Sequence, residues 1–436
     1  MFTRRRLQRY LNENAAFVSQ STLHDWVNRL NVFSDDHAAT EWEIVLLHAF
    51  ASLGRVQHEP ELGRRRLDLV FASSDGKLSF AADIVTISDQ QLHRENPIEA
   101  FWEELRRRAQ KANVRNGGFS FRVAEKPQPS NLARGNQRSL LLPRAAAFRT
   151  HVFNSAWADF LQLVRAEPNR KHGYRAHCEA PAVDVSISYH PGKFGVFQSE
   201  HGTYTSATVV DDNPLFNGLK VKARQLKASG HSGARGIIAC DGGCRMLTSS
   251  ANWSTYSVQE VVIEFFRQHR SVDFVVTIAI KSGISWDRPD RVYRANCFVS
   301  PYSFLSVSDL DSVVARAVRS LPPIELAPEN ARHALKWERW GGYGPLGGWS
   351  MGGNKVKISA RDLLALMAGR LEQKRFVKHH DLGANNIFEL HLKRGQLIVG
   401  ATVERLRDED DDWIVFEFGD PDPAVAPFSE PTARPR

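Results

Sequence analysis

From residue 213 to residue 280 the chain alternates between helical and strand-like patterns, and this alternation restricts the fold more than any other feature. A predicted helix over 213–229 leads into the apolar run RGIIACD at 235–241. A second predicted helix over 257–269 leads into the run VDFVVTIAI, which repeats the order. Such alternation is typical of a sheet flanked by helices. The sequence therefore predicts an α/β fold.

A predicted helix and three strand-like runs precede this region. The helix covers 40–53 and ends at Gly54. The runs RVQHEPEL, RRLDLVFAS and KLSFAADIVTIS follow it. Asp75 and Gly76 separate the second run from the third, and this dipeptide is a strong hairpin signal. The second and third runs are therefore expected to pair as neighbouring strands.

The other patterns indicate how the chain is divided. The predicted units are a basic helical lead-in at 1–36, a core at 37–320 with an insertion at about 89–210, a C-terminal α+β accessory region at 321–418, and an extended tail at 419–436. In the insertion, helices are expected over 97–113 and 144–165, with a β-rich end at 182–198. In the accessory region a helix is expected over 358–372, and strands over 387–404 and 412–418.

One glutamate interrupts the apolar face of the first of these helices. At about 100° per residue, Glu43 falls beside Leu47 and Phe50, whereas Glu41 falls on the opposite face. An acid within an apolar stripe is costly to bury unless a group inside the protein needs it. Glu43 is therefore the candidate functional acid, and Glu41 is interpreted as an ordinary solvated residue.

Two aspartates lie within strand-like runs, where aspartate is disfavoured. In RRLDLVF, Asp68 faces away from the two leucines that flank it. In FAADIVTI, Asp83 shares a face with Val85 and Ile87. Two carboxylates on adjoining strands of one hairpin approach each other only if a cation or a proton separates their charges. The hairpin is therefore expected to need a positive partner for these acids.

The helix predicted over 213–229 offers such a partner. Its leucines form one apolar stripe, and Lys222 lies inside that stripe. Gln225 sits at the edge of the stripe, one turn from Lys222. A lysine on an apolar face either pairs with buried carboxylates or bends outward to solvent. Lys222 is therefore the candidate cation for the acids of the hairpin.

These elements resemble the core of PD-(D/E)XK, or restriction-endonuclease-like, nucleases. The resemblance covers the helix at 40–53, the runs that contain Asp68 and Asp83, and the helix and strand over 213–241, in the family's α-β-β-β-α-β order. It implies a mixed sheet flanked by helices, in which both aspartates hold a divalent metal, Mg²⁺ or Mn²⁺, and Glu43 supports it. In this family a lysine polarises the attacking water or the scissile phosphate.

The sequence departs from the family pattern at two positions. Leu67 stands where the motif proline usually lies, and Val85 stands where the motif lysine lies. Migration of the lysine to a neighbouring helix occurs in this superfamily, and Lys222 fits that role. The candidate catalytic set is therefore Glu43, Asp68, Asp83, Lys222 and Gln225.

The charge balance indicates a phosphate-bearing partner. The formal net charge is +8, from 57 lysines and arginines against 49 acids. Guanidinium groups bind phosphate in a bidentate manner, so nucleic acid is the expected partner. Under the nuclease hypothesis, DNA is a more favoured partner than RNA. Arg64, Arg65 and Arg66 directly precede the first aspartate and are candidates to grip a phosphate. The alternative is that these three arginines form a solvated strand entrance.

Cysteine usage and hydropathy bear on the compartment. The four cysteines are scattered and do not form a disulfide framework, which favours a reducing cytoplasm. The basic N-terminus lacks the apolar segment of a signal peptide, and the chain has no apolar run of about 18 residues. A cytoplasmic location without a membrane partner is therefore expected.

The leading functional hypothesis is a metal-dependent nuclease that hydrolyses DNA phosphodiester bonds. The family resemblance implies a setting in bacterial genome defence, including defence against phage, or in DNA processing. A second hypothesis, motivated by Val85, is a catalytically inactive nuclease fold that binds DNA without metal. A third is a structural subunit of a larger complex, with a protein partner docked on the region 321–436.

Overall fold

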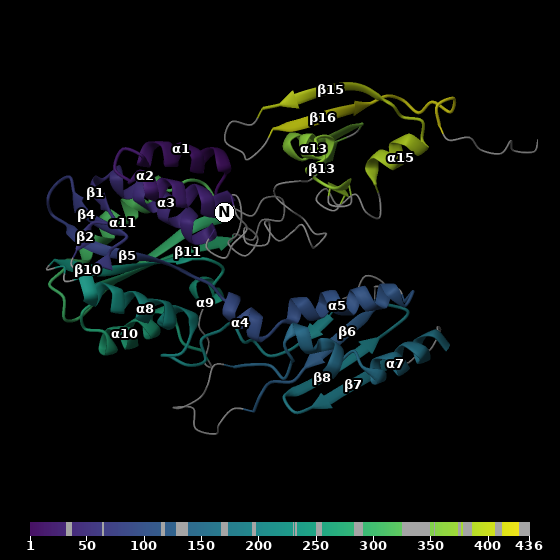
Figure 1. Cartoon of the computed structure of the whole chain (residues 1–436), viewed down its shortest axis with the longest axis horizontal. Helices are drawn as coiled ribbons and strands as arrows, with labels where there is room; N and C mark the ends of the chain where they lie inside the picture. The colour runs from purple at the N-terminus through teal and green to yellow at the C-terminus, as the bar shows by residue number, and fades with distance from the viewer. Residues whose placement is uncertain are drawn as a thin grey trace, which may run out of the picture.

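The computed structural model describes residues 1–31, 37–62, 65–114, 118–127, 138–166, 173–193, 198–229, 231, 233–249, 255–282, 291–324, 349–352, 354–373, 376–377, 386–405 and 412–426. Within these ranges the chain folds into mixed sheets covered by helices (Figure 1). The predicted α/β class is confirmed.

The central sheet combines the hairpin with the alternating region. Its order is β1 (Gly54–His58), β4 (Leu69–Ser73), β5 (Ser79–Ile87), β10 (Ala234–Asp241), β11 (Phe274–Ser282) and β12 (Arg291–Val299). Strands β5, β10 and β11 are parallel, while β1, β4 and β12 pair with antiparallel neighbours. The hairpin between β4 and β5 turns at Gly76, whose φ of 70° suits glycine. The mixed sheet therefore brings together strands that are far apart in the sequence.

Helices cover both faces of this sheet, as Figure 1 shows. One layer contains α1 (Arg4–Asn14), α2 (Gln20–Asn31), α3 (His37–Ala51) and α11 (Val307–Ser320), and the other contains α8 (Pro214–Ser229) and α10 (Val258–Gln268). Helices α1 and α2 share one buried apolar cluster with α3 and the sheet. The residues predicted as a lead-in therefore form part of the core.

Strand β5 is buried on both faces, which positions its one acid. Phe80, Ala82 and Ile84 pack in the cluster beneath α3, whereas Ala81 and Ile87 pack in the cluster beneath α8. Because side chains alternate along a strand, Asp83 belongs to the α8 face.

The predicted insertion contains a sheet of its own, with the order β7-β8-β6-β9. Its elements are α4 (Gln90–Glu95), α5 (Ile98–Lys111), β6 (Phe119–Val123), α6 (Phe148–His151), α7 (Ser155–Ala166), β7 (Tyr174–Ala180), β8 (Val183–Tyr189) and β9 (Gln198–Glu200). A separate cluster of buried apolar residues, drawn from the sequence range 92–204, supports this sheet. This part of the chain therefore has a core distinct from that of the central sheet.

The C-terminal region forms a third sheet, with the order β13-β14-β16-β15. Its elements are β13 (Trp349–Gly352), β14 (Lys355–Ser359), α13 (Ala360–Met367), α15 (Ile387–Lys393), β15 (Ile398–Glu404) and β16 (Trp413–Phe418). The prediction of one strand over 387–404 is wrong in its first half, which is α15. The Asn386 side chain caps this helix by accepting from the Phe388 and Glu389 amides, so the apolar run continues as a helix.

None of the helices in the described part of the chain combines the length and the apolar composition that a bilayer crossing needs.

Candidate active site

Asp68 and Asp83 lie side by side at the end of the β4–β5 ladder. Leu69 pairs with Ala82 in that ladder, so the residue before β4 falls next to Asp83. The Asp68 amide donates to Asp83 Oδ1 at 3.3 Å, and the Ile84 amide donates to Asp68 Oδ2 at 2.7 Å. Asp68 was expected within a strand, but it lies in the bend just before β4. The bend turns its carboxylate toward the backbone of β5.

Lys222 reaches this pair from the helix above it. Its Nζ atom donates to Asp68 Oδ2 at 3.0 Å, and its side chain is 18% exposed. Helix α8 packs on β5, and the two elements share one apolar cluster. The pairing between a lysine of the apolar stripe and an acid of the hairpin is therefore present. It occurs although the two residues are 154 positions apart in the sequence.

Asp83 is the most deeply buried member of the site, with 1% of its surface exposed. Burial raises its pKa to about 6, Lys222 opposes this rise, and the neighbouring Asp68 carboxylate adds to it. Its Oδ2 atom is buried and has no hydrogen-bond partner among the described residues. A carboxylate oxygen in this state is ready to accept a proton or to bind a cation.

The lysine is held in its charged form. Burial alone lowers the pKa of Lys222, but the carboxylates of Asp68, Asp83 and Glu43 outweigh this effect, and its pKa is raised. Lys222 therefore acts as a fixed ammonium that donates hydrogen bonds, and it does not act as a base at neutral pH.

Glu43 lies close enough to influence this lysine, but other groups hold its carboxylate. Trp26 Nε1 donates to Glu43 Oε2 at 3.0 Å, and His58 Nε2 lies 3.1 Å from Oε1. Arg29 lies 3.9 Å from the same carboxylate. His58 ends β1 opposite Leu69, the residue after Asp68, so Glu43 is anchored at the same end of the sheet. Sequence reasoning missed Trp26 and His58, although His58 lies within the strand-like run that precedes the hairpin.

The interpretation of Glu41 as a solvated acid is wrong. Glu41 is 3% exposed, and its carboxylate pairs with the Met1 amino group at 2.8 Å and with His37 at 3.1 Å. Helix α3 is buried on nearly all sides because α1 packs against the face that was expected to meet solvent. The helical pattern identified the acid that faces the hairpin, but it did not identify the more buried acid.

The remaining predicted residues contribute less to the described geometry. Gln225 is half-buried on α8, one turn beyond Lys222. Arg64 lies outside the described residues. Arg65 and Arg66 form the short strand β3 (Arg65–Arg66), which pairs with β2 (Glu61–Leu62), and their side chains also lie outside the description.

The donor set fits a divalent cation bound by two carboxylates. No group of three or more histidines, cysteines or acids is arranged as a metal site within the described ranges. Mg²⁺ keeps several waters, so one or two carboxylates and a substrate phosphate are enough for it. Asp68 and Asp83 supply hard oxygens, and the unpartnered Asp83 Oδ2 provides an open lone pair. Glu43 is directed to Trp26 and His58, so a supporting role suits it better than direct ligation.

Comparison with known proteins adds no further constraint on this site. The chain matches no protein-family model, no curated protein and no solved structure.

Proposed function

We propose that this protein is a metal-dependent nuclease of the restriction-endonuclease-like type, which hydrolyses phosphodiester bonds in DNA. The observation that carries the proposal is the 3.0 Å contact between Lys222 Nζ and Asp68 Oδ2, beside a buried Asp83 with an open oxygen. Such a contact supports the interpretation that Lys222 replaces the lysine absent at Val85. A role in bacterial genome defence or DNA processing is part of this proposal.

Each residue has a distinct chemical role. Asp68 and Asp83 would hold Mg²⁺ or Mn²⁺, which supplies an activated water and stabilises the charge that develops on the phosphate. Lys222 is fixed as an ammonium, so it donates to a phosphate or water oxygen where negative charge grows. Glu43 adds negative charge that keeps the lysine protonated. Gln225 would donate to the same substrate from the next helical turn.

The order of elements also supports the proposal. Helix α3 precedes β1, β4 and β5, and after the insertion α8 leads into β10, which pairs in parallel with β5. The acids occupy β5 and the bend before β4, and the lysine occupies the helix that leads into β10. This arrangement corresponds to the α-β-β-β-α-β order expected from the sequence.

A second candidate function is metal-independent DNA binding by an inactive nuclease fold. The observation that favours it is that Lys222 already neutralises Asp68, so the pair is stable without a metal. This function predicts DNA binding that weakens steeply with salt and is insensitive to chelators.

Cleavage of supercoiled plasmid DNA in Mg²⁺ or Mn²⁺ tests the proposal. We expect Asp83→Asn and Lys222→Met to reduce cleavage by about 100-fold or more, because both groups act on the developing charge. Two matched controls are Asp159→Asn, on the exposed face of α7, and Lys227→Met, exposed on the same helix as Lys222. These controls should stay within about twofold of the unmodified protein, since surface substitutions rarely matter. Absence of cleavage with either metal, together with chelator-insensitive DNA binding, would favour the second candidate.

A further inference from the structure

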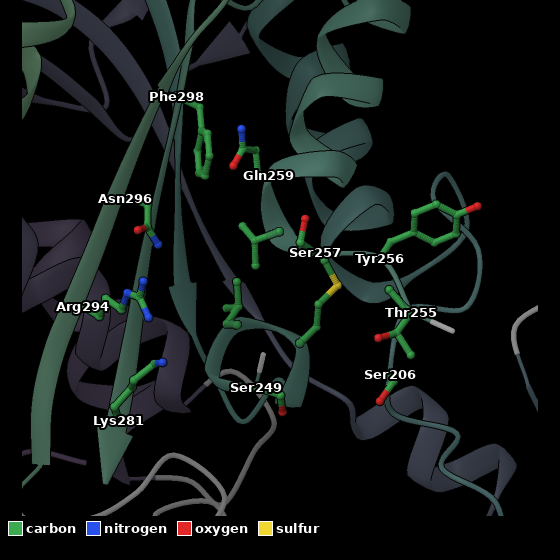
Figure 2. A pocket seen from close by; sticks show the side chains of 14 residues that line it. Ser206, Ser249, Thr255, Tyr256, Ser257, Gln259, Lys281, Arg294, Asn296 and Phe298 are labelled. Atoms are coloured by element: carbon green, nitrogen blue, oxygen red, sulfur yellow. The ribbon is translucent and has the colours of Figure 1, made fainter. Parts of the chain in front are cut away.

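A cavity of about 280 Å³ lies on the α8 and α10 face of the central sheet, at its β11–β12 side (Figure 2). Its walls come from the start of α10, from α9 (Arg245–Thr248) and from strands β11 and β12. Strand β10 separates β11 from β5, so this cavity is two strands away from Asp83. At roughly 4.8 Å between neighbouring strands, that spacing is about 10 Å or more. The cavity is therefore distinct from the candidate active site.

Side chains alternate between the two faces of β11 and β12, and this alternation directs one lysine and one arginine side chain toward the cavity. On β11, Ala279 packs in the apolar cluster beneath α10, and Lys281 continues the same face two residues later. On β12, Phe298 packs against that cluster, and Arg294 lies on the same face four residues earlier. Ala279 pairs with Arg294 in the ladder, so Lys281 and Arg294 are diagonal neighbours on one face, about 7–8 Å apart. Figure 2 shows both side chains beside the hollow.

Charge in the cavity is not balanced within the described part of the chain. None of the described residues that line the cavity is acidic, and neither Lys281 nor Arg294 has an ion-pair partner among them. Two like charges that share a hollow repel each other, and an anion between them removes that repulsion. The start of α10 adds little charge of its own, because Ser257 and Glu260 already form a capping box there. Lys281 and Arg294 are therefore the groups that select the ligand.

The remaining walls favour a small organic phosphate. Asn296 and Gln259 offer amide groups, while Phe298 and Leu247 offer apolar surface. The volume lies near the lower end of the roughly 300–1,000 Å³ of small-molecule sites. Arginine binds phosphate oxygens through paired donors, and lysine adds a point charge. We propose that this cavity binds a phosphate group, carried either by a small ligand of the nucleotide class or by the free phosphate ion.

Isothermal titration with inorganic phosphate and with nucleoside 5′-monophosphates tests this proposal in metal-free buffer. We expect saturable binding by the full chain, and at least a tenfold loss of affinity in Lys281→Gln and in Arg294→Gln. Lys227→Gln, which removes an exposed lysine from α8, should bind as the unmodified protein does. Tighter binding of a monophosphate than of phosphate identifies the nucleotide as the source, and equal binding identifies the free ion; both support a phosphate site.

Two results would overturn the proposal: no saturable binding of any of these ligands, or binding that both cavity variants retain in full. Thermal unfolding of the ligand-free variants supplies the folding control. Because each substitution removes a repelling charge, neither is expected to lower the melting temperature. The outcome is independent of DNA cleavage, so failure of one proposal does not affect the other.

Discussion

Gly218 of α8 lies directly against Ile87 of β5: a Cβ atom on the glycine would lie 2.5 Å from the Ile87 Cδ1 atom. Glycine costs about 1 kcal/mol relative to alanine within a helix, so its presence here is tied to this close approach. Lys222 follows one turn later on the same helix and reaches Asp68. The packing at Gly218 thus sets the distance over which the lysine has to extend.

Replacement of Gly218 by alanine should destabilise the protein despite the better helix propensity of alanine. Ile87 is 2% exposed and has little room to move, so overpacking should cost about 1–3 kcal/mol against a gain of about 1 kcal/mol. Urea unfolding measures the difference. Ile87→Val removes the Cδ1 methyl, so the double variant should recover stability relative to Gly218→Ala. If it recovers none, the close packing is not the reason for glycine at this position.

The sequence predicted those parts of the site that depend on a single local pattern. Lys222 was recognisable because a charged residue stood in a leucine stripe, and Asp83 because an acid stood in an apolar strand. Both patterns persist in the structure, since α8 and β5 each bury the face that the pattern marks.

The parts that escaped prediction depend on contacts between distant segments. Glu41 is buried by α1 and by the Met1 amine, and the periodicity of α3 carries no information about either. The helix at Ile387–Lys393 depends on the Asn386 cap, a signal that the apolar run beside it conceals. The cavity at Lys281 and Arg294 requires β12, a strand that sequence reasoning did not identify.

The raised pKa of Asp83 predicts a pH-dependent penalty on folding. Its pKa is about 6 in the folded chain and 3.8 in an unperturbed carboxyl, so between these values the folded state binds more protons. The contribution of Asp83 to the free energy of unfolding is therefore largest below about pH 4. It falls as pH rises to about 6, by up to roughly 3 kcal/mol. Asp83→Asn lacks this titration. In urea unfolding from pH 4 to pH 7, the free energy of unfolding of the variant should rise relative to that of the unmodified protein. Parallel pH profiles for the two proteins would contradict a raised pKa for Asp83.

Divalent cations should stabilise the folded chain through the same carboxyl. Metal binding requires the ionised form, so Mn²⁺ should raise the melting temperature more at pH 7.5 than at pH 5. Asp83→Asn should reduce this effect, whereas the exposed Asp159→Asn should leave it intact. An equal Mn²⁺ shift in the Asp83 variant would show that the cation binds elsewhere.

A lysine at Val85, the motif position in restriction-endonuclease-like nucleases, tests the proposal that Lys222 replaces it. Val85 shares the strand face of Asp83 and lies below α8, so a lysine at Val85 points into the same space. We expect Lys222→Ala to reduce DNA cleavage by about 100-fold. Adding Val85→Lys to that variant should raise its cleavage at least about tenfold. Val85→Met with Lys222→Ala is the matched control for side-chain length. Equal activity of the two double variants would argue against a migrated lysine.

Glu41 and Glu43, two residues apart on α3, should separate stability from activity. The Glu41 side chain is 4% exposed; burial raises its pKa, but the Met1 amine and His37 outweigh burial, so the pKa is lowered. A lowered folded pKa stabilises the protein above the unfolded value near 4.5, and this stability is lost as pH falls through the folded pKa. Glu41→Gln should therefore cost about 3–5 kcal/mol at pH 7, as when one partner leaves a buried ion pair, and less near pH 3.

Glu43→Gln keeps hydrogen-bonding capacity toward Trp26 and His58, so it should cost only about 1 kcal/mol. It removes a negative charge that holds Lys222 protonated, and it should lower cleavage while the fold persists. Urea unfolding and plasmid cleavage on the same two variants give four measurements. If Glu43→Gln is as destabilising as Glu41→Gln and cleaves normally when folded, Glu43 has a structural role, and the helical pattern that selected it pointed to the wrong property.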